Sequence, residues 1–390
     1  MYRTHRTIWI VSVALASVGL FAASAAADDW DTCKKSTGDE AIAACGNAIT
    51  SGKLQGADLV TAVGKRGNAY FANGDLDRAI ADYSEAIRLD PKSALAFNNR
   101  GFAYFSKGDV DHSVADYSDA IRLDPKYILA FNNRGRAYSL KGDQDNAIAD
   151  YSEAIRLDPQ FSIAFYGRGT AYAQKRDFDR AIADLSEAIR LKPTFFLALN
   201  TRGIAYAQKG DYDHAIADHS EAIRLDPKSA SAFNNRGFAY FSKGDVDHSV
   251  ADYSEAIRLD PKYILAFNNR GRAYSLKGDQ DNAIADYSEA IRLDPKSAFA
   301  FNNRGIAYAQ KGDYDHAIAD YSEAIRLNPN REWSYVHRGD GYLSKADPTR
   351  AKVDFETALR LDPKDADAAK GLKHAQADLE AKRSTKKSRR

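Results

Sequence analysis

The sequence predicts an all-α fold, a right-handed superhelical solenoid of helix-turn-helix repeats that are each 34 residues long. The first observation is a proline that returns at this spacing, at Pro91, Pro125, Pro159, Pro193, Pro227, Pro261, Pro295, Pro329 and Pro363. The second is an arginine-glycine pair with a tyrosine three residues after the glycine, the glycines being Gly67, Gly101, Gly135, Gly169, Gly203, Gly237, Gly271, Gly305 and Gly339. Self-similarity at one fixed period indicates stacked helical hairpins, because each hairpin can bury its apolar face only against its neighbours.

The unit 94–127 shows how the first helix follows from its residues. Phe97, Gly101 and Tyr104 lie at i, i+4 and i+7, which is one face of a helix. Gly108 is expected to end that helix in a left-handed conformation, which glycine adopts without steric cost. A glycine in mid-helix costs about 1 kcal/mol relative to alanine, so Gly101 predicts a close approach by a neighbouring helix.

The second helix of the same unit has its own start and stop signals. Asp109 or Asp111 is expected to cap its N-terminus or to complement its dipole. Its apolar face consists of Val110, Val114, Tyr117 and Ile121. Pro125 ends the helix, because proline lacks the backbone N–H and clashes with the preceding turn.

This pattern resembles the tetratricopeptide repeat family, whose signature is an aromatic residue, Leu-Gly, Tyr, Ala, a second aromatic residue and Pro. In the unit 128–161 these positions are Phe131, Arg134, Gly135, Tyr138, Ala147, Tyr151 and Pro159. Arginine replaces the usual leucine in all nine units. The resemblance implies nine repeats over residues 60–365, a concave groove lined by the first helices, and a protein or peptide partner in that groove.

The arginine that replaces leucine needs a partner of its own. Arg100 lies on the first helix and Asp116 on the second helix of one unit, and both columns recur in all nine units. Hairpin geometry is expected to bring the two columns together as structural ion pairs. Each pair would contribute modestly to stability if it were exposed.

Two long stretches of the chain are copies of each other. Residues 97–159 and 233–295 differ only in having Asp119 in one and Glu255 in the other. Agreement among these units is therefore weak evidence of selection for function. The units 162–195 and 332–365 have diverged, and they keep the Arg-Gly-x-x-Tyr, Ala and Pro columns, so those columns report folding.

The N-terminus has the features of a targeting segment. Arg3 and Arg6 precede an apolar run over residues 8–21, and an alanine-rich stretch follows. This arrangement predicts a signal peptide over 1–27 with cleavage before Asp28. An uncleaved anchor is the alternative, because the apolar and alanine-rich stretch is about long enough to cross a bilayer. A periplasmic or secreted location is expected.

Export would place the two cysteines in an oxidising compartment, where disulfides form. Cys33 and Cys45 lie in a segment, 28–59, that is expected to form a helical hairpin capping the array. A structural staple is favoured over a redox site, since redox pairs more naturally show C-x-x-C spacing. At the other end, residues 366–381 are expected to form a capping helix. Residues 382–390 are expected to be a disordered basic tail, with weak contact to anionic polymers or lipid as the alternative.

The residues give little indication of catalysis or of a cofactor. A net charge of +1 offers no global attraction to nucleic acid. Neither a glycine-rich nucleotide loop nor a paired nucleophile and base is evident, so no catalytic residue, cofactor or metal ion is expected. Histidines recur in Asp-x-Asp-His, at His112, His214, His248 and His316. Helix capping is favoured for them, because a metal site needs several ligands that converge on one ion.

The candidate binding feature is a ladder of paired asparagines on the first helices. The pairs are Asn98 and Asn99, Asn132 and Asn133, Asn234 and Asn235, Asn268 and Asn269, and Asn302 and Asn303. The second asparagine of each pair matches a place where the O-linked N-acetylglucosamine transferase branch of the family carries asparagines that hold a peptide backbone. A carboxamide can donate to and accept from one peptide unit. Phe102 and Phe238 are expected to add apolar pockets, and Arg136 and Arg272 positive charge.

The expected function is non-enzymatic binding of a protein or peptide in the groove, as a scaffold in the cell envelope. A simpler interpretation of the ladder is a solvated polar face multiplied by duplication, and Tyr166-Gly167 and Val336-His337 interrupt it. Carbohydrate binding in an exported polysaccharide pathway is the alternative function, which aromatic rings exposed along the groove would favour. An enzyme is the weakest interpretation. Membrane contact is expected only through an uncleaved signal segment or the basic tail.

Overall fold

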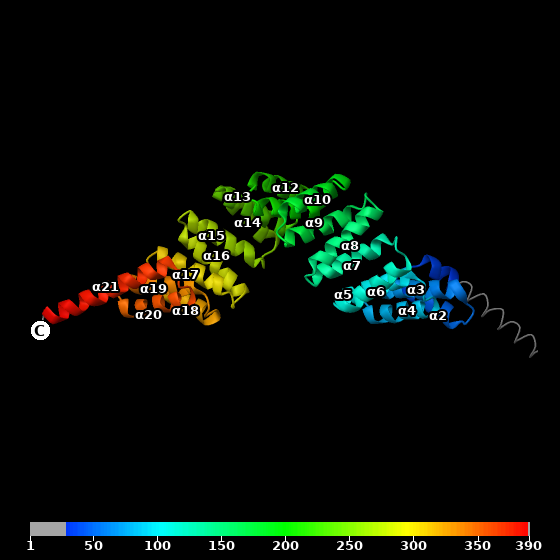
Figure 1. Ribbon diagram of the computed structural model, residues 1–390, viewed down its shortest axis with the longest axis horizontal. Helices are drawn as coiled ribbons and strands as arrows, with labels where there is room; N and C mark the ends of the chain where they lie inside the picture. The colour runs from blue at the N-terminus through cyan, green and yellow to red at the C-terminus, as the bar shows by residue number, and fades with distance from the viewer. Residues whose placement is uncertain (1–28, 389–390) are drawn as a thin grey trace, which may run out of the picture. The chain divides into compact units, whose positions relative to one another are not determined.

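The computed structural model describes residues 29–388, and the regular structure in this range is entirely helical (Figure 1). The expected all-α fold of stacked hairpins is confirmed. The signal peptide predicted at 1–27 lies outside the described residues. The chain divides into two compact units between Ala198 and Leu199.

Each repeat is a hairpin of two helices. The first helices are α3 (Gly56–Ala72), α5 (Ala94–Lys107), α7 (Ile128–Leu140), α9 (Ser162–Gln174), α11 (Phe196–Gln208), α13 (Ala230–Lys243), α15 (Ile264–Leu276), α17 (Ala298–Gln310) and α19 (Glu332–Ser344). The second helices are α4 (Leu76–Leu89), α6 (Val110–Leu123), α8 (Gln144–Leu157), α10 (Phe178–Leu191), α12 (Tyr212–Leu225), α14 (Val246–Leu259), α16 (Gln280–Leu293), α18 (Tyr314–Leu327) and α20 (Pro348–Leu361). Within each unit a second helix packs against the first helix of its own repeat and against that of the next repeat.

The turn between the two helices of a hairpin is built as the residues predict. Gly108 has a φ of +87°, in the left-handed region. Asp109 is the N-cap residue of α6, and its side chain accepts a hydrogen bond from the backbone N–H of His112 at 3.3 Å. The other second helices begin with the same cap, at Asp75, Asp143, Asp177, Asp211, Asp245, Asp279, Asp313 and Asp347. The repeated aspartates therefore start helices.

Gly101 marks the close helix contact that its mid-helix position predicts. A Cβ atom at this position would lie 2.9 Å from the ring of Tyr117 on α6. Any other residue would push α5 and α6 apart, since this distance is well inside van der Waals contact. The glycine column thus reflects packing within each hairpin.

The expected ion pairs form, and they are buried. Arg100 donates from Nε and Nη2 to the two carboxylate oxygens of Asp116, at 2.8 and 2.7 Å. Its Nη1 donates to Ser84 Oγ at 3.1 Å. The side chains of Arg100 and Asp116 are 21 % and 6 % exposed. The modest contribution to stability that is expected of an exposed ion pair therefore does not apply to them. Because Ser84 belongs to the preceding repeat, one arginine joins α4, α5 and α6.

The same arginine–aspartate ion pair, made by two hydrogen bonds, recurs in the other repeats. The pairs are Arg66–Asp82, Arg134–Asp150, Arg168–Asp184, Arg202–Asp218, Arg236–Asp252, Arg270–Asp286, Arg304–Asp320 and Arg338–Asp354. Burial raises the pKa of the Asp150 carboxyl although Arg134 lies beside it. Desolvation therefore offsets much of the attraction between the two charges.

The N-terminal cap contains helical residues 29–35 and α2 (Gly38–Thr50), which packs against α3. A disulfide bond joins Cys33 to Cys45, and both residues are fully buried. Burial of the sulfur atoms suits a structural staple, because a redox pair must be reached by its substrate. α3 begins at Gly56, so the boundary expected at residue 60 falls inside the first helix of the first repeat.

The C-terminal cap is longer than the sequence predicts. α21 (Ala366–Ser388) packs against α20 and α19, and it continues through the segment expected to be a disordered tail. The expected helix end at residue 381 is therefore wrong. No glycine or proline follows Gly371, and alanine, lysine and arginine are good helix formers. Lys382 Nζ also donates to the backbone carbonyl of Ala346 at 2.7 Å.

Candidate functional site

The first helices form a row within each unit. α5 contacts α7 and α7 contacts α9, and in the second unit α13, α15, α17 and α19 follow one another in the same way. Leu95, Asn99, Phe102 and Ser106 are spaced three or four residues apart, so they share one side of α5. We call the side formed by these four positions in all repeats the first-helix face.

The first asparagine of each pair is buried. Asn98 is 6 % exposed, and its Oδ1 accepts a hydrogen bond from Asn133 Nδ2 of the next repeat at 3.0 Å. Asn234 accepts from Asn269 in the same way, also at 3.0 Å. These side chains lie in the junctions between repeats, where no partner reaches them. The prediction that these residues line a peptide-binding groove is therefore wrong for Asn98, Asn132, Asn234, Asn268 and Asn302.

The second asparagine of each pair is half-buried and lies on the first-helix face. These residues are Asn99, Asn133, Asn235, Asn269 and Asn303. Asn235 Nδ2 also donates to the preceding repeat, to the half-buried Asn200 Oδ1 at 3.2 Å. Two buried oxygens have no partner among the described residues: Asn132 Oδ1, where Gly167 interrupts the ladder, and Asn268 Oδ1, where Asn303 continues it. The ladder is therefore not a merely solvated face, because alanine at Asn133 or Asn269 would take a donor from a buried acceptor, Asn98 or Asn234.

Two arginines on the first-helix face carry charges with no acidic partner among the described residues. The guanidinium of Arg136 lies 4.8 Å from the centre of the Phe105 ring, and that of Arg272 lies 4.5 Å from the Phe241 ring. Both arginines are exposed. The half-buried rings at the equivalent positions of the preceding repeats are Phe102 and Phe238. Both arginines are thus available to an acidic group of a ligand.

An exposed apolar column runs along the first-helix face, and it was not predicted from the sequence. Leu95 is 59 % exposed and Leu129 is 48 % exposed. The same position carries Ile163 and Leu197 in the first unit, and Leu265 and Phe299 in the second unit. The signal was present: the position two residues before the first-helix aromatic residue is apolar in most repeats. Helical periodicity places that position away from the buried alanine and glycine columns.

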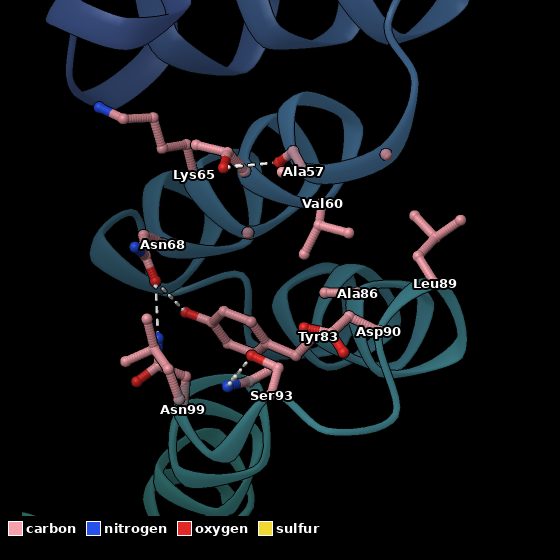
Figure 2. A pocket seen from close by; sticks show the side chains of 15 residues that line it. Ala57, Val60, Lys65, Asn68, Tyr83, Ala86, Leu89, Asp90, Ser93 and Asn99 are labelled. Carbon is pink, nitrogen blue, oxygen red and sulfur yellow. Dashed lines mark hydrogen bonds between the residues drawn. The ribbon is translucent and has the colours of Figure 1, made fainter.

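A hollow of about 730 Å³ opens between α3, α4 and α5 (Figure 2). Part of its lining is apolar and consists of Val60, Ala86, Leu89 and Ala96. A polar corner lies opposite: Asn68 Oδ1 accepts from Tyr83 Oη at 2.8 Å and from Asn99 Nδ2 at 3.4 Å. Leu95 and Asn99 belong both to this lining and to the first-helix face. The hollow therefore continues the face at its N-terminal end.

The recurring histidines occupy helix starts, as expected. His112 Nδ1 lies 2.8 Å from Asp109 Oδ2, and its ring stacks on Tyr104 with centres 5.1 Å apart. His214, His248 and His316 repeat this arrangement. Within residues 29–388, no three potential metal ligands gather at one point, and no helix has the length and apolar character of a membrane span.

Comparisons with known proteins agree with this architecture. Family models described as TPR repeat match residues 67–108, 103–142, 135–176, 203–244, 239–278 and 271–312. Models described as tetratricopeptide repeat match residues 162–195, 298–331 and 334–365. No curated protein matches the chain.

Two solved structures share the fold over long stretches. The Cut9–Hcn1 hetero-tetramer of the APC/C is 17 % identical, with 86 % of this chain and 83 % of that chain covered and a TM-score of 0.52. A tetratricopeptide repeat protein from Parabacteroides merdae is 19 % identical, with 64 % of this chain and 98 % of that chain covered and a TM-score of 0.51. At these identities the likeness concerns the fold alone. The family models cover most of the sequence, and the chain belongs to the tetratricopeptide repeat family.

Proposed function

We propose that the chain is a non-catalytic scaffold that binds an extended segment of a protein partner along its first-helix face, outside the cytoplasm. The observation that carries the proposal is the exposed apolar column beginning with Leu95 and Leu129, beside half-buried amides and unpaired arginines. Tetratricopeptide repeats typically mediate contacts between proteins. In this chain the first-helix face presents apolar and charged side chains that are available to such a partner.

The three groups on the face suit different parts of a peptide. Leucine side chains that remain half-exposed gain free energy when a partner covers them, by about 25 cal/mol for each Å² of apolar surface removed from water. The amides of Asn99 and Asn133 can bond a peptide N–H or C=O. Arg136 and Arg272, which have no acidic partner within residues 29–388, can pair with carboxylates of the ligand. The partner segment is therefore expected to combine apolar and acidic residues.

No observation favours the carbohydrate alternative. A sugar-binding platform needs a row of aromatic rings that lie open along the face. Phe299 is exposed, but Leu129 and Leu265 at the same position of other repeats are aliphatic, so it does not belong to such a row. Phe102 and Phe238 are half-buried, and the rings of Phe105 and Phe241 are covered by arginine guanidinium groups.

Photo-crosslinking tests the first-helix face directly. A benzophenone amino acid at Leu129 or Leu265 is expected to crosslink to one segment of a partner, whereas the same group at the exposed Arg156 on α8 is not. A synthetic peptide of that segment should then bind at least tenfold more weakly to the Leu95→Ser/Leu129→Ser variant, because about 1.4 kcal/mol of lost burial is one decade in affinity. The duplicated repeat carries Ser231 in place of Leu95, so the fold tolerates serine there. Equal crosslinking from Arg156, or unchanged peptide affinity, would contradict the proposal.

Export is tested separately at the N-terminus. The arginines and apolar run that precede Asp28 are expected to direct secretion and to be removed. N-terminal sequencing of the native protein should begin near Asp28, and the protein should fractionate with the periplasm or the medium. Intact Met1 on soluble cytoplasmic protein would show that the segment does not direct export.

A further inference from the structure

The hollow between α3, α4 and α5 is lined by two small residues, Gly64 on α3 and Ser93 at the start of α5. At the position of Gly64, other first helices carry Asn98, Asn132, Asn200, Asn234, Asn268 and Asn302. At the position of Ser93, four other junctions carry an aromatic residue, Tyr127, Phe161, Phe195 and Tyr263, whereas Ser229 and Ser297 keep the serine. A Cβ atom added at Gly64 would meet no atom within 4 Å, so the space beside it is open.

The junction of α7, α8 and α9 shows what fills the equivalent space elsewhere in this chain. Phe161 packs there in one cluster with Ile128, Ala154, Leu157 and Ala164. The residues two repeats earlier at these four positions are Val60, Ala86, Leu89 and Ala96, all of which line the hollow. The position of Phe161 itself corresponds to Ser93. The hollow therefore has the walls of a phenylalanine site, and no ring stands at the position of Phe161.

The charged groups at the edge of the hollow form their hydrogen bonds outside its interior. Lys65 Nζ donates to the backbone carbonyl of Lys34 at 2.6 Å, and in Figure 2 this side chain points away from the apolar wall. The Asp90 carboxylate accepts from the backbone N–H of Lys92 at 3.1 Å. A charged side chain in the hollow would lose hydration without gaining a partner, whereas an uncharged ring loses little. The electrostatic match is therefore to a neutral aromatic group.

We propose that this hollow binds the phenylalanine or tyrosine side chain of a protein segment that continues along the first-helix face. The inference rests on the proposed function and specifies the anchor residue of its ligand. Leu95 and Asn99 provide the continuity, since they belong to both surfaces. The 3.4 Å hydrogen bond from Asn99 to Asn68 is long, and it is readily exchanged for one to the backbone of the bound segment.

The probe is N-acetyl-phenylalanine methylamide, with N-acetyl-alanine methylamide as its matched control. Binding is followed by NMR through the backbone amide shifts of Ala57 and Gly64 in the purified chain. The phenylalanine amide is expected to cause saturable shifts and to bind at least tenfold more tightly than the alanine amide. Absence of saturable shifts, or equal shifts from both amides, overturns the proposal.

A variant that fills the hollow from within provides the second test. Ser93→Phe places a ring where Phe161 stands in the α9 junction, and it is expected to reduce binding of the phenylalanine amide at least tenfold. Ser297→Phe is the matched control, because Ser93 and Ser297 are both N-cap residues whose side chains accept from a backbone N–H at 3.3 Å. Gly64→Asn is the substitute if Ser93→Phe fails to fold by circular dichroism, since asparagine is native at that position in other repeats. Undiminished binding in the filled variant contradicts the proposal.

The outcome separates this inference from the proposed function. If the phenylalanine amide does not bind while Leu129 still crosslinks to a partner, the anchor site is wrong and the first-helix face stands. If the amide binds at the hollow while Leu129 and Leu265 capture no segment, the aromatic site stands and the extended binding mode fails.

Discussion

Replacement of Arg134 by leucine, the residue usual for the family at this position, is expected to lower the free energy of unfolding of the surrounding repeats by about 3–5 kcal/mol. The change leaves the Asp150 carboxylate in the hairpin without its two guanidinium donors, and it removes the bond to Ser118 at 3.0 Å on the preceding second helix. Urea unfolding gives the total effect. Hydrogen exchange over α7 and α8 localises it, because repeat arrays can open locally.

Two further variants separate the charge from the packing. Arg134→Leu combined with Asp150→Leu should recover most of the loss, since a buried pair replaced by apolar residues is often neutral or stabilising. Arg136→Leu makes the same change two residues along α7, where the side chain is exposed and has no acidic partner among the described residues. Its effect should stay within about 0.5 kcal/mol. An Arg134→Leu variant as stable as Arg136→Leu would show that the buried pair is dispensable.

The parts of the fold that depend on contacts within a hairpin could be predicted from the sequence. The Arg100 and Asp116 columns are 16 residues apart, and a hairpin with a short turn brings such positions level. Gly101 and Tyr117 are related in the same way, and Asp109 acts on the helix that directly follows it. Each of these relations is short in sequence and repeated in several copies, so its physical meaning could be read from one unit.

Contacts between repeats were harder to foresee. Asn98 and Asn133 are 35 residues apart, and their hydrogen bond depends on how two first helices are rotated against each other. Adjacent residues on a helix point about 100° apart. The angles around one helix place Asn99 with Leu95, away from Gly101, but they do not show that the buried Asn98 accepts its hydrogen bond from the next repeat. The hollow beside Gly64 and Ser93 was hard to foresee for the same reason, because residues of different helices line it together.

The end of α21 and the exposed leucines were missed for a different reason. Basic residues after Lys382 look like a solvated tail, yet lysine, arginine and alanine all permit a helix when nothing stops it. Leu95 and its equivalents belong to none of the signature positions of the repeat. Their position relative to Gly101 was enough to place them outside the core, since six residues correspond to about 600°, or 240° around the helix axis.

A second large effect is expected from His219, the buried ring of α12. It stands where the other second helices carry tyrosine, leucine or phenylalanine, and it is 1 % exposed. Its Nδ1 lies 3.1 Å from Asn200 Oδ1, and its Nε2 has no partner among the described residues. Burial, aided by the positive charge of Arg236, lowers the pKa of His219 from 6.5 to about 4.

Mild acid is therefore expected to destabilise the repeats around α12. In the unfolded chain the pKa of this histidine returns to its ordinary value of about 6.5, so the unfolded state takes up a proton that the folded state does not. The contribution of His219 to the free energy of unfolding decreases as the pH falls from about 6.5 to about 4, by about 3 kcal/mol in total. Below the folded-state pKa both states are protonated, and this contribution decreases no further.

His219→Tyr is expected to remove this part of the acid sensitivity. Tyr253 and Tyr321 occupy the equivalent positions of α14 and α18, so the hairpin accommodates the ring, and a tyrosine remains neutral throughout the window. The measurement is the difference in the free energy of unfolding between about pH 7 and about pH 4.5, which should shrink by about 2–3 kcal/mol. His214→Tyr is the control on the same helix, because His214 is exposed and lies outside the hairpin core, with its Nδ1 beside Asp211 Oδ2. A His219→Tyr protein that keeps the original difference would locate the acid sensitivity elsewhere.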